Sequence, residues 1–177
     1  EQAVGFMNAH INEAPEPLEG QVFGGLDLSA TTDLTALVLT CRKGGVLHVH
    51  PFFWMPHDTV AEASKRDRAP YDVWVREGLL RTTPGRVIDY AFVARDIAEI
   101  TAGLGVARIG FDRWRMDRMK AALDAAGVDL PLEPFGQGYV SMSPALDALE
   151  SDLLMERVRH GGHPVLAMCA ANAVAVP

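Results

Sequence analysis

Two aspartates, Asp27 and Asp112, lie at the ends of short apolar runs that are typical of buried strands. Residues 24–29 read Gly-Gly-Leu-Asp-Leu-Ser, and residues 109–112 read Ile-Gly-Phe-Asp. Removing a carboxylate from water costs several kcal/mol unless it is paired, hydrogen-bonded or bound to a metal. Two such strands in one sheet would bring the carboxylates together, and such a pair usually holds a divalent cation.

A carboxylate pair of this kind can support phosphodiester hydrolysis. Carboxylate oxygens are the hard ligands that Mg²⁺ and Mn²⁺ prefer. Two such ions about 4 Å apart can activate a water and stabilise the leaving oxygen. Two acids are too few for two ions, so we expect a third or fourth ligand. Asp33, at the mouth of the first hairpin, is placed to reach the site directly or through a water.

Each acid also has a purely structural explanation. That explanation is weakest for Asp27, because an aspartate inside a strand has no capping role and a low strand propensity. Asp112 could instead cap the helix that follows it. For Asp33 and Asp89, capping or turn formation is the more common role.

Other catalytic motifs are absent from the sequence. It has no Gly-x-x-x-x-Gly-Lys-Ser/Thr loop, which excludes a Walker-type phosphate site, and no Gly-x-Ser-x-Gly or Gly-x-Gly-x-x-Gly motif. Cys41 and Cys169 are the only cysteines and lie in apolar runs, so neither a disulfide framework nor a zinc cluster is indicated. His160 and His163, which flank a Gly-Gly pair, are candidates for substrate contact, although most histidines are surface or core residues.

The composition indicates one soluble globular domain. The chain has 177 residues, 49% of them hydrophobic, which is enough for one sizeable core. No apolar run approaches the roughly 20 residues that span a bilayer, and no signal peptide is evident. Residues 1–20 include a stretch rich in Pro and Glu, so we interpret them as a linker and a remnant of an upstream region, and residues 21–177 as the globular domain.

The formal net charge of −7 is unusual for an enzyme that acts on nucleic acid, because phosphate contacts require Lys and Arg. Basic residues nevertheless cluster after the second aspartate. Any single cluster is more often a solvated helix face. An acidic domain can still act on DNA where a partner domain grips the duplex, and the candidate DNA contacts are Arg113, Arg115, Lys120 and His160.

The elements that would position the acids form an α/β pattern. Apolar runs predict three antiparallel strands at 22–29, 34–41 and 46–53, with a Lys-Gly-Gly turn between the last two. Pro51 places the third strand at an edge. Helical spacing and caps predict helices, interleaved with strands at 106–111 and 130–135, over residues 58–68, 70–78, 89–103, 113–126, 143–160 and 164–172. A right-handed crossover then brings Asp112 near Asp27.

The helix expected at 143–160 has a distinct start signal. Ser143 can cap it, and Pro144 suits the first helical position. The residues that recur at helical spacing and are predicted to face inward are Leu146, Leu149 and Leu153.

Five sequence blocks in the same order resemble the C-terminal nuclease domain of tailed-phage terminase large subunits. The most specific is Gly-Leu-Asp-Leu-Ser-Ala-Thr-Thr-Asp-Leu-Thr-Ala at 25–36. The others are Gly-Arg-Val-Ile-Asp-Tyr at 85–90, Gly-Phe-Asp-Arg-Trp at 110–114, Phe-Gly-Gln-Gly-Tyr and Ser-Met-Ser-Pro-Ala within 135–145, and His-Gly-Gly-His-Pro-Val-Leu at 160–166. The resemblance extends from about Phe23 to Val176.

The resemblance implies a ribonuclease H-like fold, in which a mixed sheet of three antiparallel strands and then parallel strands is flanked by helices. It also implies a two-metal endonuclease, using Mg²⁺ or Mn²⁺, that cuts concatemeric double-stranded viral DNA during head filling. Asp27 would be the first-strand acid and Asp112 the second. The family's third acid follows the strand that begins near Ala173, so its counterpart would fall beyond Pro177. We therefore expect a C-terminally truncated domain that cuts feebly by itself.

The same resemblance implies partners and a location. The partners would be double-stranded DNA, the terminase ATPase domain upstream of Glu1, the portal protein and the small terminase subunit, with no membrane involved. The location would be the cytoplasm of the infected bacterial host and, transiently, the procapsid portal.

Two alternatives remain open at this point. The chain could act mainly as a docking module, with its acidic surface, the apolar run Phe-Phe-Trp-Met at 52–55 and Trp74 engaging the portal or the ATPase domain. A run of this kind is, however, more often ordinary strand core than an interface. It could also be another ribonuclease H-like enzyme, such as a transposase or a Holliday-junction resolvase. The blocks after residue 130 favour the terminase family over these enzymes.

Overall fold

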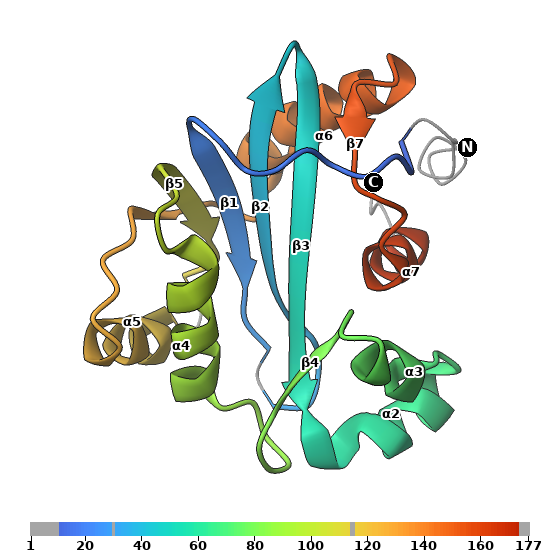
Figure 1. The fold of residues 1–177 in the computed structure, drawn as a ribbon, viewed down its shortest axis with the longest axis vertical. Helices are drawn as coiled ribbons and strands as arrows, with labels where there is room; N and C mark the ends of the chain where they lie inside the picture. Colours follow the sequence, from blue (N-terminus) through green and yellow to red (C-terminus); the bar gives the residue numbers. More distant parts are fainter. Residues whose placement is uncertain (1–10, 30, 114–115, 174–177) are drawn as a thin grey trace.

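The computed structural model describes residues 11–29, 31–113 and 116–173, whose arrangement Figure 1 shows. The described chain forms one mixed sheet in the order β4-β3-β2-β1-β5-β6, with β7 paired to β3. The strands are β1 (Val22–Asp27), β2 (Thr35–Lys43), β3 (Val46–Pro56), β4 (Arg81–Thr83), β5 (Val106–Phe111), β6 (Leu132–Pro134) and β7 (Val158–Arg159). The helices are η1 (His57–Thr59), α2 (Val60–Asp67), α3 (Tyr71–Arg76), α4 (Tyr90–Thr101), α5 (Met116–Ala125), α6 (Tyr139–Leu154) and α7 (Pro164–Asn172). None of the described helices is both long and apolar enough to cross a membrane.

The first half of the sheet is the predicted antiparallel unit of β1, β2 and β3. Gly44 and Gly45 form the turn between β2 and β3 with φ of 55° and 83°, a conformation that glycine adopts without the penalty of a Cβ. Pro51 lies between the short pairings that β3 makes to β7 and to β4 on its outer side. The predicted edge position of this strand is therefore wrong, because β4 and β7 pair with β3 on the side opposite β2. Proline has no N–H to donate, so it is tolerated in the gap between these two pairings.

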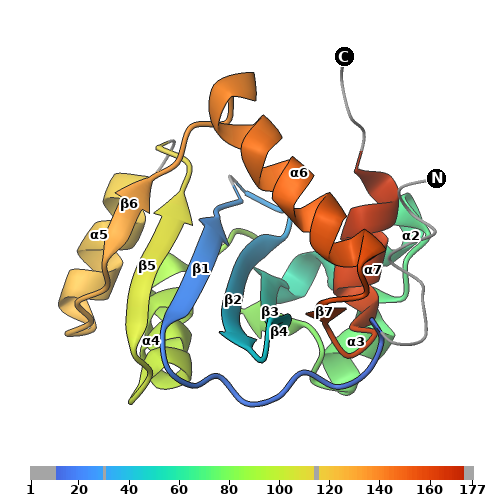
Figure 2. The same ribbon diagram turned by 90° about the horizontal axis from the view of Figure 1, so that it is seen from above.

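The second half of the sheet is parallel. β5 pairs in parallel with β1, and β6 pairs in parallel with β5. The mixed sheet expected from the sequence is therefore present. Figure 2 shows α4 on one face of the sheet and α6 crossing the other. The buried side chains of α4 and α5 join those of β1, β2 and β5 in one cluster, whereas α7 packs with β3 in another.

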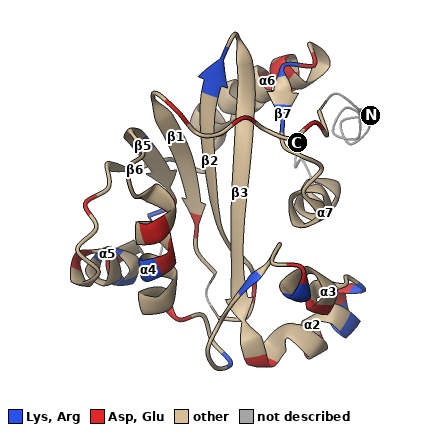
Figure 3. Ribbon diagram, viewed as in Figure 1, with Lys and Arg blue, Asp and Glu red and all other residues tan. Residues whose placement is uncertain are grey.

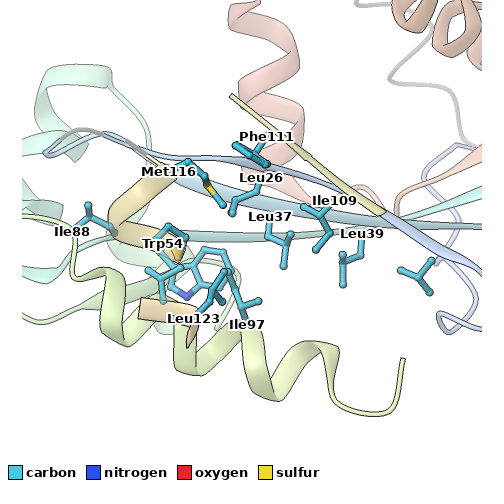
Figure 4. Packing of buried hydrophobic residues seen from close by; sticks show 14 of the residues in the cluster. Leu26, Leu37, Leu39, Trp54, Ile88, Ile97, Ile109, Phe111, Met116 and Leu123 are labelled. Atoms are coloured by element: carbon cyan, nitrogen blue, oxygen red, sulfur yellow. The ribbon is translucent and has the colours of Figure 1, made fainter. Parts of the chain in front are cut away.

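The core between the sheet and α4 is closely packed, as Figure 4 shows for its largest side chains. Leu37 and Leu39 of β2 are fully buried there, and Ile109 of β5 is 1% exposed. Gly24 faces the same core: a Cβ added to it would lie 2.9 Å from Leu39 Cδ2 and 3.2 Å from Ile109 Cγ1. The first glycine of the Gly-Gly pair is thus explained by packing density.

Residues 11–20 lie against the sheet. Ile11 is fully buried. The Glu16 amide donates a hydrogen bond of 3.0 Å to His48 Nδ1, and the Glu16 carbonyl oxygen is 2.8 Å from His50 Nε2. The described part of the segment interpreted as a linker is therefore packed across β3 and β2 (Figure 1), while the domain boundary itself stays a prediction.

Helix α6 differs from the prediction in where it begins and ends. It starts at Tyr139, four residues before the expected Ser143 cap, because the Gly138 carbonyl accepts two amide hydrogen bonds that close the first turn. Pro144 consequently lies inside the helix. The helix ends at Leu154, and the short strand β7, which the sequence did not indicate, follows it.

The buried face of α6 also differs from the prediction. Leu153 is partly buried, but Leu146 and Leu149 are 54% and 38% exposed. The one described α6 residue that is buried is Asp152, which is ion-paired to Arg42 of β2 and, at 3.0 Å, to Arg157. These ion pairs attach the C-terminal end of α6 to the protein through a charged residue rather than through the predicted leucine face.

Candidate active site

The two aspartates singled out by the sequence lie side by side. Leu26 of β1 pairs with Phe111 of β5 in parallel register, and Asp27 and Asp112 are the residues that follow them. Neighbouring strands are about 4.8 Å apart, and side chains alternate between the faces of a sheet. Because Leu26 points into the α4 core, Asp27 projects from the opposite face, and Asp112 directly follows the end of β5 beside it. Asp27 is exposed and Asp112 is partly exposed, so solvent and a substrate can reach the pair.

The sheet surface beside the acid pair carries no side chains, because two glycines lie there. Gly25 of β1 pairs with Gly110 of β5, one row of side chains before the aspartates on the same face. A Cβ added to Gly25 would meet no atom within 4 Å, and one added to Gly110 would meet only Phe135 at 3.5–3.8 Å and the Gly24 carbonyl oxygen at 3.9 Å. Glycine inside a strand often marks close approach of a ligand to the backbone. The second glycine of the Gly-Gly pair therefore leaves space beside the acids.

Of the predicted basic contacts that the structure describes, Arg113 lies next to the pair, whereas Lys120 lies on the other face of β5. Arg113 directly follows Asp112 and is exposed. Lys120 on α5 is exposed, and its Nζ lies 4.9 Å from the centre of the Phe111 ring, on the core side of β5. Arg115 lies outside the described residues. Figure 3 shows how lysines, arginines and acidic residues are interspersed over the molecule, in keeping with the net charge of −7.

This arrangement matches a known group of proteins. A sequence profile of the terminase large subunit endonuclease domain matches residues 10–176. The chain belongs to the terminase large subunit nuclease family. The family predicted from the five sequence blocks is therefore confirmed, and the profile covers the acid pair and all five blocks.

The relatives of this terminase nuclease domain include a phage protein and a bacterial one. The chain is 59% identical to the terminase large subunit of Enterobacteria phage HK97 over 155 residues, which are 87% of this chain and 31% of that protein. It is 28% identical to Protein YmfN of Escherichia coli strain K12 over 169 residues, which are 90% of this chain and 37% of that protein. The chain thus spans about a third of the length of these curated relatives.

Two solved structures share the fold. The crystal structure of the HK97 bacteriophage large terminase aligns with a TM-score of 0.90 and 53% identity, over 97% of this chain and 36% of that one. The large terminase nuclease from thermophilic phage G20c aligns with a TM-score of 0.56 and 11% identity, over 97% of this chain and 80% of that one. The second match shows the fold alone, and it confirms the predicted ribonuclease H-like architecture.

Asp33, the predicted third ligand, faces another part of the terminase nuclease domain. Its side chain is 76% exposed, and Oδ1 lies 3.9 Å from an Arg66 guanidinium nitrogen. A cavity of about 280 Å³ at this point is lined by Thr32, Asp33, Leu34, Met55, Ala63, Arg66, Asp67 and Tyr71. Within the described chain, no group of three or more His, Cys, Asp or Glu residues is placed to hold a metal. The role of Asp33 as a ligand stays a prediction without support from this geometry.

The two candidate histidines lie away from the acids. His160 is 2% exposed, and its Nδ1 accepts a hydrogen bond of 3.2 Å from the Gly162 amide. His160 directly follows β7, which pairs with β3 at His48. Asp27 lies level with Phe53 of β3, across Ala36 of β2. His48 and Phe53 are five residues apart, so His160 lies roughly 17 Å along the strand from the level of Asp27. Burial and position do not fit the predicted contact with DNA, so we leave His160 out of the site.

His163, the other candidate, packs its ring 5.4 Å from that of Phe53. Burial holds its pKa below the ordinary value, so the neutral form is favoured. This environment is that of a core histidine.

The residues proposed for a docking surface belong to the core. Phe53, Trp54 and Met55 are 3% exposed or less, and Trp74 is 9% exposed. Trp54 Nε1 also donates a hydrogen bond of 2.7 Å to Asp96 on α4. The interpretation of this run as a partner surface was wrong, because β3 is covered on both faces.

Sequence reasoning missed the contacts around the loop that follows Asp27. Asp89 caps α4, as predicted, by accepting hydrogen bonds from the amides of Ala91 at 2.9 Å and Phe92 at 3.1 Å. The next residue, Tyr90, reaches across to the Ser29 carbonyl. The block at 85–90 was the signal for this contact, but its partner is remote in sequence.

Proposed function

We propose that this terminase nuclease domain cleaves double-stranded DNA by metal-dependent phosphodiester hydrolysis at the Asp27–Asp112 pair. The observation that carries the proposal is the register of β1 and β5, which sets two carboxylates side by side at an open edge of the sheet. The family match supports the reaction class, because the matched profile is that of an endonuclease domain.

Mg²⁺ or Mn²⁺ is the cofactor that these residues fit. Both donors are carboxylates, the hard oxygen ligands that such ions prefer, and the glycine row beside them leaves room for a ligand. When bound, two divalent ions would supply Lewis-acid stabilisation of the charge that develops on the phosphate and on the leaving oxygen. Such a site needs further oxygen ligands: Asp33 stays a prediction for one of them, and the sequence has no acidic residue after Ala173 for the third acid that the family resemblance implies.

The protein's own side chains have separate roles in this proposal. Asp27 and Asp112 hold the cofactor, and the open surface at Gly25 and Gly110 lets the DNA backbone approach them. Arg113 contacts a phosphate next to the cleaved bond, and the basic residues that follow it extend the contact. Because phosphate contacts supply most of the non-specific affinity for DNA, a chain with a net charge of −7 binds weakly by itself. A partner domain must therefore hold the duplex.

The relatives suggest the biological setting. The HK97 relative is a terminase large subunit, and we propose that this domain likewise cuts concatemeric viral DNA during packaging. Its partners would be the terminase ATPase domain, the small subunit and the portal, in the cytoplasm of the infected host. The family match favours this setting over a transposase or a resolvase.

Mn²⁺ titration and cleavage of supercoiled plasmid test the proposal together. We expect the wild-type chain to bind Mn²⁺ and to nick the plasmid slowly, and Asp27→Asn to lose both activities. Asp124→Asn is the matched control, because Asp124 is an exposed aspartate near the other end of α5. This variant should behave as the wild type does.

Two results would contradict the proposal. If Asp27→Asn bound Mn²⁺ and cut as well as the wild type, the acid pair would not be the site. If the wild type neither bound Mn²⁺ nor cut, the pair would not be a nuclease centre in this chain.

A further inference from the structure

The backbone that leaves Asp27 is held by two hydrogen bonds from different elements. Tyr90, the first residue of α4, donates a hydrogen bond of 2.6 Å from its phenol to the Ser29 carbonyl. The Ser29 amide donates one of 3.0 Å to Thr35 Oγ1 at the start of β2. Ser29 is two residues after Asp27, so both polar groups of its backbone are tied down close to the first candidate ligand.

A second set of hydrogen bonds fixes the start of α4, from which Tyr90 reaches the Ser29 carbonyl. The Ile88 amide donates a hydrogen bond of 3.1 Å to the Thr31 carbonyl, on the same loop. The Asp89 amide donates one of 3.2 Å to Thr83 Oγ1, and the Asp89 carboxylate caps the first turn of α4. Thr83 is fully buried in β4. Tyr90 is therefore anchored through the two residues that precede it, to the loop by Ile88 and to β4 by Asp89.

The hydrogen bond between Ser29 and Thr35 is buried, and the one from Tyr90 to the Ser29 carbonyl is partly buried. Ser29 is 5% exposed and Thr35 is fully buried, while Tyr90 packs against the main core. A backbone carbonyl in this environment needs a hydrogen-bond partner, so we expect the loop to shift when the Tyr90 hydroxyl is lost. Asp27 keeps its pairing with Ala36 in β2 in that event. The expected change is a local reorientation at the end of β1 rather than unfolding of the sheet.

We propose that Tyr90 is a positioning residue for Asp27, acting through the Ser29 carbonyl to hold the carboxylate in its orientation beside Asp112. This inference rests on the proposed function, since it assigns Tyr90 a role in the affinity of that site for its cation. Partners that orient metal ligands without touching the metal typically change metal affinity or activity about 10- to 100-fold when removed. Because Tyr90 acts through the backbone, we expect an effect near the lower end, about tenfold.

The test uses Tyr90→Phe, which removes only the hydroxyl group. The matched control is Tyr71→Phe, which removes a phenol hydroxyl that donates a hydrogen bond of 3.2 Å to Asp67, where α2 and α3 meet. The measurements are Mn²⁺ titration of the chain, the Mn²⁺ concentration at half-maximal plasmid cleavage, the thermal midpoint, and amide hydrogen exchange over residues 27–35.

The expected result separates positioning from general stability. Tyr90→Phe should weaken Mn²⁺ binding and raise the Mn²⁺ requirement for cleavage about tenfold, with much of the rate restored at saturating Mn²⁺. Its amides at 27–35 should exchange faster, while α5 is unchanged. Tyr71→Phe should leave the Mn²⁺ dependence and this exchange as in the wild type. The inference would be overturned if Tyr90→Phe and the wild type had the same Mn²⁺ dependence. It would also be overturned if Tyr90→Phe and Tyr71→Phe raised the Mn²⁺ requirement equally.

The exchange measurement distinguishes failure of this inference from failure of the proposed function. If the wild type does not bind Mn²⁺, the proposed function fails. In that case, faster amide exchange at 27–35 in Tyr90→Phe, but not in Tyr71→Phe, would still support the conclusion that Tyr90 restrains the loop after Asp27. Unchanged exchange in Tyr90→Phe would overturn the role of Tyr90 whether or not the protein binds a metal.

Discussion

A matched pair of glycine substitutions in β1 tests whether one face of the strand packs in the core while the other lies open beside the acid pair. Gly24 and Gly25 are neighbours that face opposite sides of the sheet. A Cβ on Gly24 would lie 2.9 Å from Leu39 Cδ2, 3.2 Å from Ile109 Cγ1 and 3.2 Å from the Val38 carbonyl oxygen. A Cβ on Gly25 would meet no atom within 4 Å.

The magnitudes follow from these contacts. Neither glycine has a positive φ, so alanine fits the backbone at both positions and favours folding by about 0.5–1 kcal/mol, chiefly by restricting the unfolded chain. At Gly24 the added methyl also overpacks a core in which Leu39 is fully buried, which costs about 1–3 kcal/mol. We expect Gly24→Ala to lower the free energy of unfolding by about 0–2.5 kcal/mol, and Gly25→Ala to leave it unchanged or to raise it.

Urea denaturation of the two variants and the wild type measures this difference. In a thermal scan, each kcal/mol corresponds to about 2–4 °C for a domain of this size. The plasmid assay should give the reverse order, because Gly25→Ala places a methyl group beside the acid pair and Gly24→Ala does not. Equal destabilisation by the two substitutions, or greater destabilisation by Gly25→Ala, would refute the assignment of the two faces.

Two further predictions concern Asp152 and Arg113. The hydrogen bond from an arginine of β2 holds the pKa of Asp152 below its ordinary value, so its stabilisation is present above the unfolded pKa of about 3.9 and is lost as the pH falls through the lower, folded pKa. Urea denaturation below about pH 4 should therefore show a steeper loss of stability in the wild type than in Asp152→Asn, and parallel profiles would contradict this reasoning. Arg113→Ala should weaken DNA binding without changing stability. It should also reduce the slope of the logarithm of affinity against the logarithm of salt concentration by the equivalent of about one phosphate contact, as measured by fluorescence anisotropy. The exposed Arg76→Ala on α3 should change neither property, and equal losses in both variants would exclude Arg113 as a specific contact.

The order of strands was predictable because its signals are local. The Lys-Gly-Gly turn, the apolar runs and the capping Asp89 each act over a few residues, and all are found in the structure. The adjacency of Asp27 and Asp112 also followed from the sequence, since a crossover of fixed handedness leaves few places for β5. The family blocks supported the same arrangement.

Which side of α6 and of β3 is buried could not be predicted in the same way. Leu146 and Leu149 have the spacing of an inward face, yet they are exposed, and the buried residue among those described in α6 is the ion-paired Asp152. The run at 52–55 is compatible with strand core or with a partner surface, and the packing of helices on both sides of β3 decides for the core. Periodicity shows that a helix or strand has an apolar side, but it does not show what covers that side.

Strands, turns, helix caps and the chain positions of the two acids are thus encoded by residues that are near one another in sequence, where backbone preferences and side-chain alternation act directly. The tertiary structure alone decided that His160 is buried, that Asp33 faces Arg66, and that Tyr90 holds a carbonyl 61 residues away. Each of these outcomes depends on a contact between segments that only the packed sheet and helices bring together. The acid pair can be recognised from sequence, while the groups that hold it in position are defined by packing.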